Sequence, residues 1–394
     1  GDRGGRDGDD YSHREASESM EIGPEDAAFL VGRKGSTKRK VARAAGVEMI
    51  IDTDSNKLTI RGPPENVARA RDYVDYVCRQ RVGGISLDLT RPESPARDDA
   101  TAFSVPGPCV GFIMGRKGQT LRSMEEEWGT LMFFANTSGD GPGGDRSSEK
   151  MCIFGPFRGR RGALFKVLSA IEHKEPGFCV EDNQLKLPPF IKGDVDKDGW
   201  GFDTVPLRGD DYSYALGRGG SVRKKLAAAS ACILEYVGNL ACMVGFEDER
   251  ARCREYLNML LEQRGGTCTP DTHGRDDVDI VKVPSESVGF ITGRGGEALR
   301  RLEQMTQTFC FTEGSGQARN KDSSGEETEN LLIFGAKDNN RKRAVELVRR
   351  RIEEHRLGPR GGYDDYDRDS GYGRGGGGGG YGGRDRYDDR DRDR

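Results

Sequence analysis

Paired glycines with cationic residues between them recur four times along the chain. The four segments are Gly32-Arg33-Lys34-Gly35, Gly115-Arg116-Lys117-Gly118, Gly217-Arg218-Gly219-Gly220 and Gly293-Arg294-Gly295-Gly296. Glycine has no Cβ, so the backbone of such a bend can come close to a sugar-phosphate chain. The arginines and lysines add positive charge that attracts phosphate groups. This residue pattern indicates four binding sites for a phosphate-containing ligand.

A second cationic feature follows the bend in the first and third segments. Its residues are Lys38, Arg39, Lys40, Arg223 and Lys224. The second and fourth segments instead carry acids there, including Glu125, Glu126, Glu127 and Glu303. Acids near a phosphate path lower the affinity for a polyanion. We therefore expect the first and third segments to contribute most of the binding.

The same pattern of elements surrounds every bend. A short apolar segment precedes it, a helical pattern and an apolar strand-like run follow, and a second strand ends at a glycine before an amphipathic helix. The strand-ending glycines are Gly62, Gly155, Gly245 and Gly335. Four matches to one long template indicate an internal repeat. Each bend should then join two helices, and the second helix should direct its unsatisfied N–H groups toward the bend.

The four copies alternate between two types. Copies one and three share the basic cluster after the bend, whereas copies two and four have a longer polar loop between their two strands. The order A-B-A-B indicates that a two-domain segment was doubled.

The repeated pattern resembles the KH (K-homology) domain in its type I arrangement. The resemblance rests on the Gly-x-x-Gly bend, the Ile-x-Gly strand end and the final helix, taken together. It implies an α+β fold of four β-α-α-β-β-α domains, each with a three-stranded antiparallel sheet and three helices. The expected domains are residues 19–81, 101–174, 199–264 and 277–356, with flexible linkers at 82–100, 175–198 and 265–276.

The two ends of the chain have a different composition. Residues 1–18 are polar, and residues 357–394 consist largely of Gly, Arg, Asp and Tyr. Such segments cannot bury enough apolar surface to fold alone, so we expect both to be disordered. The C-terminal segment resembles RGG-type tails of RNA-binding proteins. Two interpretations of this tail stay open: its Arg and Tyr side chains stack on bases, or the tail is merely solvated and self-associating.

The KH resemblance also implies a function. A KH module holds about four nucleotides of a single strand at its Gly-x-x-Gly loop. Its bases would lie on an apolar groove, here near Leu30, Val31, Met49 and Ile50. The implied protein binds single-stranded RNA without catalysis in mRNA processing, stability or translation, in the manner of multi-KH ribonucleoproteins of the poly(C)-binding type. Single-stranded DNA is an open alternative ligand, and other ribonucleoproteins are expected partners.

Composition argues against several other classes. The nine cysteines form no CxxC pair and the four histidines do not recur at equivalent positions of the repeat, so we expect no metal, cofactor or catalytic residues. The sequence shows neither a signal peptide nor an apolar run long enough for a bilayer. We expect a location in the nucleus, the cytoplasm or both. The net charge of −4 does not exclude nucleic-acid binding, because such binding depends on local basic patches and not on the total charge.

The sequence also bears on three rival interpretations. A nucleotide-hydrolysing phosphate loop is disfavoured because GxxxxGK[ST] is absent. A helix-turn-helix is disfavoured because strands follow the second helix. An interaction scaffold, whose glycines only turn the chain between helices, stays open.

Overall fold

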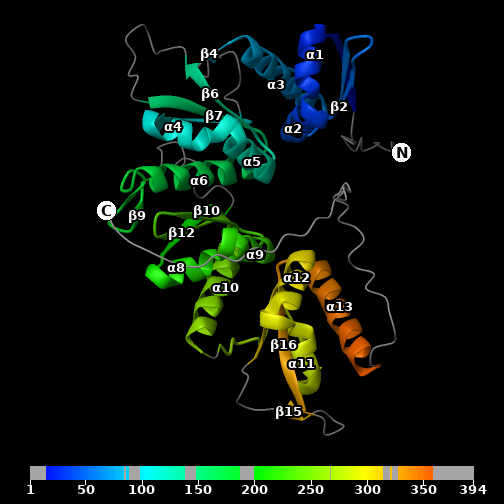
Figure 1. Cartoon of the computed structure of the whole chain (residues 1–394), viewed down its shortest axis with the longest axis vertical. Coiled ribbons are helices and arrows are strands. Elements are labelled where there is room, and N and C mark those ends of the chain that lie inside the picture. The colour runs from blue at the N-terminus through cyan, green and yellow to red at the C-terminus, as the bar shows by residue number, and fades with distance from the viewer. Residues whose placement is uncertain are drawn as a thin grey trace, which may run out of the picture.

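The computed structural model describes residues 15–83, 86–87, 98–137, 148–186, 199–266, 268–313, 320–321 and 327–357 (Figure 1). The predictions for residues 1–14 and 358–394 fall outside the described residues. Residues 16–18 were expected to be disordered, but they form the start of a strand (Ala16–Glu21) that pairs with the sheet of the first unit. Within them, the chain forms four units with the element order β-α-α-β-β-α, each with a short 3-10 turn between its first two helices. The α+β class and the predicted order of elements are confirmed.

Units 1 and 2 make up the N-terminal half. Unit 1 contains β1 (Ala16–Glu21), α1 (Pro24–Val31), η1 (Arg33–Gly35), α2 (Ser36–Ala45), β2 (Glu48–Asp52), β3 (Lys57–Gly62) and α3 (Pro64–Val82). Unit 2 contains β5 (Ala100–Pro106), α4 (Gly107–Met114), η2 (Arg116–Gly118), α5 (Gln119–Trp128), β6 (Leu131–Thr137), β7 (Ser148–Phe154) and α6 (Phe157–Lys174).

Units 3 and 4 repeat this order. Unit 3 contains β10 (Trp200–Pro206), α8 (Gly209–Leu216), η3 (Arg218–Gly220), α9 (Ser221–Ser230), β11 (Ile233–Val237), β12 (Leu240–Phe246) and α10 (Glu247–Gly265). Unit 4 contains β13 (Val278–Pro284), α11 (Ser285–Thr292), η4 (Arg294–Gly296), α12 (Glu297–Thr306), β14 (Phe309–Thr312), β16 (Glu327–Phe334) and α13 (Asp338–Arg356).

The last strand of each unit lies at the centre of its sheet. The orders are β1-β3-β2, β5-β7-β6, β10-β12-β11 and β13-β16-β14, and every one of these pairs is antiparallel. A short β15 (Asn320–Lys321) adds to β16. Two further elements fall in stretches expected to be linkers. β4 (Ser86–Leu87) pairs in parallel with β6, and β8 (Val180–Glu181) forms a hairpin with β9 (Gln184–Leu185).

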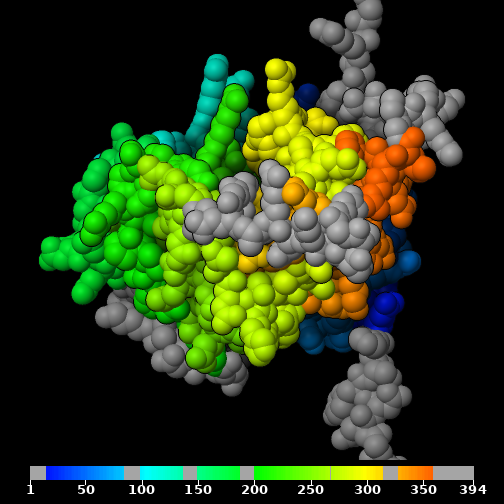
Figure 2. All heavy atoms as spheres, turned by 90° about the horizontal axis from the view of Figure 1, so that it is seen from below, coloured from blue at the N-terminus to red at the C-terminus, as the bar shows by residue number. Residues whose placement is uncertain are grey.

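Neighbouring units share hydrophobic cores. Tyr73 and Val77 of α3 pack in one cluster with Phe133 and Phe154 of the second sheet. α6 packs in the same way on the third sheet, and α10 on the fourth. Each of these long helices therefore covers the outer face of the next sheet, as α6 does above β10 and β12 in Figure 1. Figure 2 shows from below how the green surface of unit 3 meets the yellow and orange surface of unit 4.

This packing differs from the expected independent domains on flexible linkers. In the second, third and fourth sheets the central strands bury consecutive residues of both faces, such as residues 151–154 and 331–334, and β11 is buried along its whole length. A strand buried on both faces needs a cover on each, and the preceding unit supplies the outer one. The units are consequently stacked directly on one another.

The first sheet has a different outer face. Its strand β1 alternates between exposed and half-buried residues, as expected for a sheet with one solvated side. Glu48, Ile50 and Arg61 occupy the positions that Leu131, Phe133 and Phe154 fill in the second sheet. None of the described elements covers this polar face with an apolar side chain cluster.

Candidate nucleic-acid interface

The four glycine bends have nearly the same backbone conformation. In the first, Gly32 has φ 65° and ψ 179°, Lys34 has φ 54° and ψ 31°, and Gly35 has φ 76° and ψ 17°. In the second, Gly115 has φ 66°, Lys117 φ 53° and Gly118 φ 72°. The third and fourth bends repeat this pattern, with Gly219 and Gly295 at the third position. The sequence prediction that four equivalent bends join two helices is confirmed.

The first glycine of each bend has a packing reason. A Cβ on Gly32 would lie 2.2 Å from Oγ1 of Thr37, and one on Gly115 would lie 2.0 Å from Oγ1 of Thr120. Both residues also have the positive φ that side chains rarely adopt. The close contact brings the start of the second helix directly beside the bend.

The bends present their middle residues to solvent. In every unit the two middle residues are exposed and the flanking glycines are half-buried. The exposed cations are Arg33, Lys34, Arg116, Lys117, Arg218 and Arg294. None of these side chains forms an ion pair with another described residue, so their charge is available to a ligand.

The second helices add backbone donors. α2, α5, α9 and α12 each have ten residues and begin directly after the bend. No side chain caps the N-terminus of any of these four helices. The first-turn N–H groups and the helix dipole therefore favour an anion at this point.

A basic residue seven positions after the first glycine holds the bend in shape. Arg39 donates to the Lys34 carbonyl at 2.8 Å, and Arg122 donates to the Lys117 carbonyl at 2.7 Å. Arg300 makes the same bond to Gly295 at 2.7 Å, and Lys224 takes this place in unit 3. The sequence interpretation selected Arg39 and Lys224 as ligand contacts and missed Arg122 and Arg300. The recurrence of a cation at this position was the signal that could have found them.

Two residues selected from the sequence lie away from the bend surface. Arg223 is 3% exposed, pairs with Glu235 at 2.6 Å and Glu127 at 2.8 Å, and donates to the Leu234 carbonyl. Lys40 lies 3.0 Å from the buried Glu125. Position 223 corresponds to buried Leu121 in unit 2, which explains why its side chain points inward. In this structure both cations pair with acids of the neighbouring unit.

The acids of unit 2 also differ from expectation. Glu125 faces Lys40 and Glu127 faces Arg223, so neither carboxylate lies unpaired along a phosphate path. Burial raises the pKa of Glu125, against the opposing effect of the Lys40 cation. Burial also acts to raise the pKa of Glu127, but the hydrogen bond and charge of Arg223 leave it below its usual value. These acids hold neighbouring units together.

The expected base-binding residues are only partly available. Leu30 is fully buried and Met49 is 4% exposed, so both are core residues. Ile50 is 42% exposed but lies on the polar outer face of the first sheet. Val31 is half-buried and lies at the end of α1, beside the bend. Of the four residues, it is therefore the one that is both partly accessible and next to the bend.

The described ranges offer no metal-binding cluster and no membrane-spanning helix. No group of three or more His, Cys, Asp or Glu side chains gathers there in a way that could hold a metal ion. No described helix combines the length and apolar character that crossing a bilayer requires.

The fold and the bends together define the class of protein. The sequence profile of the KH domain matches residues 17–75, 101–169 and 278–350, which together make up just over half of the chain. The chain belongs to the KH-domain family, whose members bind single-stranded nucleic acid. The profile does not match residues 199–264, although unit 3 has the same element order and bend.

Curated relatives align with much of this chain. Far upstream element-binding protein 2 of Homo sapiens is 22% identical over 365 residues, which cover 82% of this chain and 48% of that protein. Far upstream element-binding protein 1 of Rattus norvegicus is 22% identical over 310 residues, covering 71% and 46%. The chain thus spans about half the length of these relatives.

Solved structures give a weaker match. The crystal structure of Dim2p from Pyrococcus horikoshii OT3 is 20% identical and covers 41% of this chain and 94% of its own, with a TM-score of 0.18. A score this low supports no functional conclusion.

Proposed function

We propose that this protein binds single-stranded RNA through the glycine bends of four KH domains and has no catalytic activity. It acts in mRNA processing, stability or translation, in the nucleus, the cytoplasm or both. The domains span residues 19–81, 101–174, 199–264 and 277–356. Unit 3 is included as a KH domain because its element order is the same as that of the three matched units and its bend angles are close to theirs.

The observation that carries the proposal is the repeated exposure of cations at a helix start. Each bend combines positive side chains, close backbone access and uncapped N–H groups at one point. Side-chain charge attracts any phosphate, and the bend selects a single strand because backbone must approach closely. Lys38 and Lys224 lie on the following helices and extend the positive surface.

A salt titration with an unstructured RNA oligonucleotide tests this function. The full chain should bind, and its affinity should fall steeply as the salt concentration rises. The variant Arg33→Asp/Lys34→Asp/Arg218→Asp/Gly219→Asp should lose most of this affinity while keeping its circular dichroism spectrum. Aspartate is tolerated at the positive φ of positions 34 and 219, so unfolding is not expected.

Three results would contradict the proposed site, the proposed function or the proposed ligand. Equal affinity for the variant and the unmodified chain would remove the bends from the binding site. Absence of salt-dependent binding would favour a protein-interaction scaffold. Tighter binding to DNA than to RNA of the same sequence would overturn the choice of RNA.

A further inference from the structure

The junction between units 1 and 2 recurs between units 3 and 4. Lys40 of α2 lies 3.0 Å from Glu125 of α5, and Lys225 of α9 lies 3.1 Å from Glu303 of α12. Each lysine is eight residues after the first glycine of its bend, and each glutamate is ten residues after. The glutamates also accept equivalent backbone bonds, from Met132 N–H at 2.9 Å and Cys310 N–H at 2.8 Å. The second helices of both pairs therefore meet in the same register.

The long helices meet the following sheet in the same way in both pairs. Tyr73 of α3 donates to Asp99 at 2.8 Å, and its ring lies 5.5 Å from that of Phe154 at 62°. Tyr256 of α10 donates to Asp277 at 2.8 Å, and its ring lies 5.5 Å from that of Phe334 at 60°. Because helix and sheet contacts both recur, the two pairs have one common arrangement.

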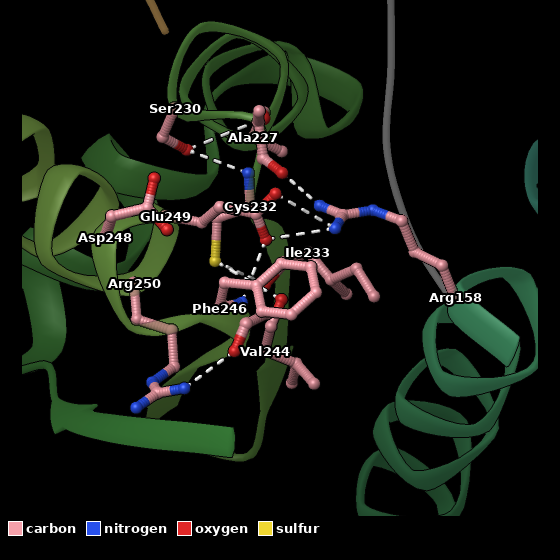
Figure 3. A network of polar contacts seen from close by, with 12 residues as sticks. Arg158, Ala227, Ser230, Cys232, Ile233, Val244, Phe246, Asp248, Glu249 and Arg250 are labelled. Carbon is pink, nitrogen blue, oxygen red and sulfur yellow. Dashed lines mark hydrogen bonds and ion pairs between the residues drawn. The ribbon is translucent and has the colours of Figure 1, made fainter. Parts of the chain in front are cut away.

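The central junction, between units 2 and 3, is built differently. Lys166 of α6 takes the place of Tyr73 and Tyr256, and it lies 3.4 Å from buried Glu235. Figure 3 shows Arg158 reaching from α6 toward the segment around Cys232. The Arg158 guanidinium pairs with Glu249 at 3.0 Å and donates to the Ala231 carbonyl. The four units are thus two copies of one two-unit body, joined by a junction of another kind.

We propose that each two-unit body recognises one RNA segment with two contact points at a fixed separation, and that the separation is the same in both bodies. The inference rests on the proposed function. A shared core and a partly buried ion pair hold the two bends of a body in place, so the strand must match a preset distance. The ligand class is a single-stranded RNA that carries the same spaced pair of contact sites twice.

A length scan on two full-length variants tests the inference. In the first variant, Arg218→Asp/Gly219→Asp/Arg294→Asp/Gly295→Asp inactivates the second body. In the second variant, Arg33→Asp/Lys34→Asp/Arg116→Asp/Lys117→Asp inactivates the first. The probes are labelled oligouridylates and oligocytidylates of increasing length, from about 4 nucleotides, the length that one KH module holds.

The affinity of each variant should rise in a step once the oligonucleotide reaches the second bend. The step should be at least about tenfold, because the second contact becomes intramolecular. It should occur at the same length in both variants. Steps at different lengths, or a gradual rise in either variant, would overturn the inference while leaving RNA binding intact. If the unmodified chain binds no probe, the proposed function fails and the inference fails with it.

Variants that loosen the first junction give a second test, with Lys40→Arg as the matched control. Lys40→Ala removes the cation of the ion pair and Glu125→Gln removes its anion. Each should reduce the affinity step of the first body by at least threefold. Neither should change the affinity for the shortest probe. Lys40→Arg, which can keep the pair, should retain the step. If Lys40→Ala weakens and Glu125→Gln strengthens short-probe binding, Lys40 contacts phosphate directly and the coupling argument is wrong.

Discussion

Nζ of Lys40 lies 3.0 Å from Oε1 of Glu125, across the junction between two units of the chain. The glutamate side chain is 2% exposed and the lysine side chain 24%. A buried carboxylate needs a nearby cation or a proton, because burial disfavours its charged form. This contact therefore makes the packing of two units depend on one residue of the basic cluster.

Lys40→Ala should destabilise the chain at neutral pH by about 1–3 kcal/mol, because it leaves the Glu125 carboxylate buried without its cation. Burial raises the folded-state pKa of Glu125 above its usual value, and loss of Lys40 raises it further. The folded state then binds this proton more tightly than the unfolded state does. The contribution of Glu125 to stability accordingly falls as the pH rises from its unfolded pKa through its folded pKa.

Urea unfolding at neutral and mildly acidic pH measures this effect. The difference between Lys40→Ala and the unmodified chain should shrink as the pH falls toward the range where Glu125 binds its proton. Lys40→Arg should show a smaller difference at every pH. A loss that is independent of pH would mean that Lys40 stabilises the junction through its aliphatic packing alone.

Gly115→Ala should destabilise unit 2 by about 1–3 kcal/mol. The new Cβ would lie 2.0 Å from Oγ1 of Thr120, at a residue whose φ is +66°. Gly111→Ala, four residues earlier in α4, is the matched control, because no atom lies within 4 Å of a Cβ added at position 111. Thermal unfolding should show a lower midpoint for the first variant and an equal or higher one for the second. Equal midpoints would contradict the packing argument.

Tyr256→Phe should destabilise the chain by about 1–2 kcal/mol, since it removes a hydrogen bond to the buried Asp277 carboxylate. Burial alone would raise the pKa of Asp277, but hydrogen bonds from Arg275 and Tyr256 bring it below its usual value. Stability from this group is present above its unfolded pKa and is lost as the pH falls through its folded pKa.

The loss from Tyr256→Phe should therefore be largest near neutral pH and smaller in acid. Tyr73→Phe should give a similar loss, because its hydroxyl makes the equivalent bond to Asp99. Tyr214→Phe is the control, with a side chain 38% exposed. Chemical unfolding monitored by circular dichroism measures all three, and equal effects of Tyr256→Phe and Tyr214→Phe would contradict the prediction.

The thiols of the native chain should react slowly with Ellman's reagent. Eight of the nine cysteines are buried and Cys78 is half-buried. Burial raises the pKa of Cys152, Cys179 and Cys242 to about 12, so little of the reactive thiolate forms near neutral pH. Reaction at pH 8 should be slow until urea is added and then complete. Fast labelling of several thiols in the native chain would show that the cores open readily.

The sequence predicted the elements of the fold because they depend on local patterns. Glycine at the bend, apolar spacing in the helices and glycine at the strand end are each read from a few adjacent residues. The exposed cations Arg33, Lys34, Arg116 and Arg218 follow from the same local reading. The site role of these residues remains a prediction.

Contacts between units were beyond this reading. Lys40 and Arg223 stand in basic runs, and nothing local distinguishes a solvent-facing cation from one paired to a glutamate far along the chain. The double-sided burial of β11 was visible only as an apolar run, which does not name its cover. Comparison of Arg223 with Leu121 at the same repeat position was the one available clue.

The polar outer face of the first sheet has a consequence for self-association. Long helices cover the outer sheet faces of the next unit in a head-to-tail manner, and such heterologous contacts can propagate from copy to copy into open filaments. Glu48 and Arg61 stand where the second sheet has Leu131 and Phe154, so a helix from another copy would have to desolvate charge in order to dock there. The charged first face therefore disfavours the docking of a long helix from a second copy at this end of the stack.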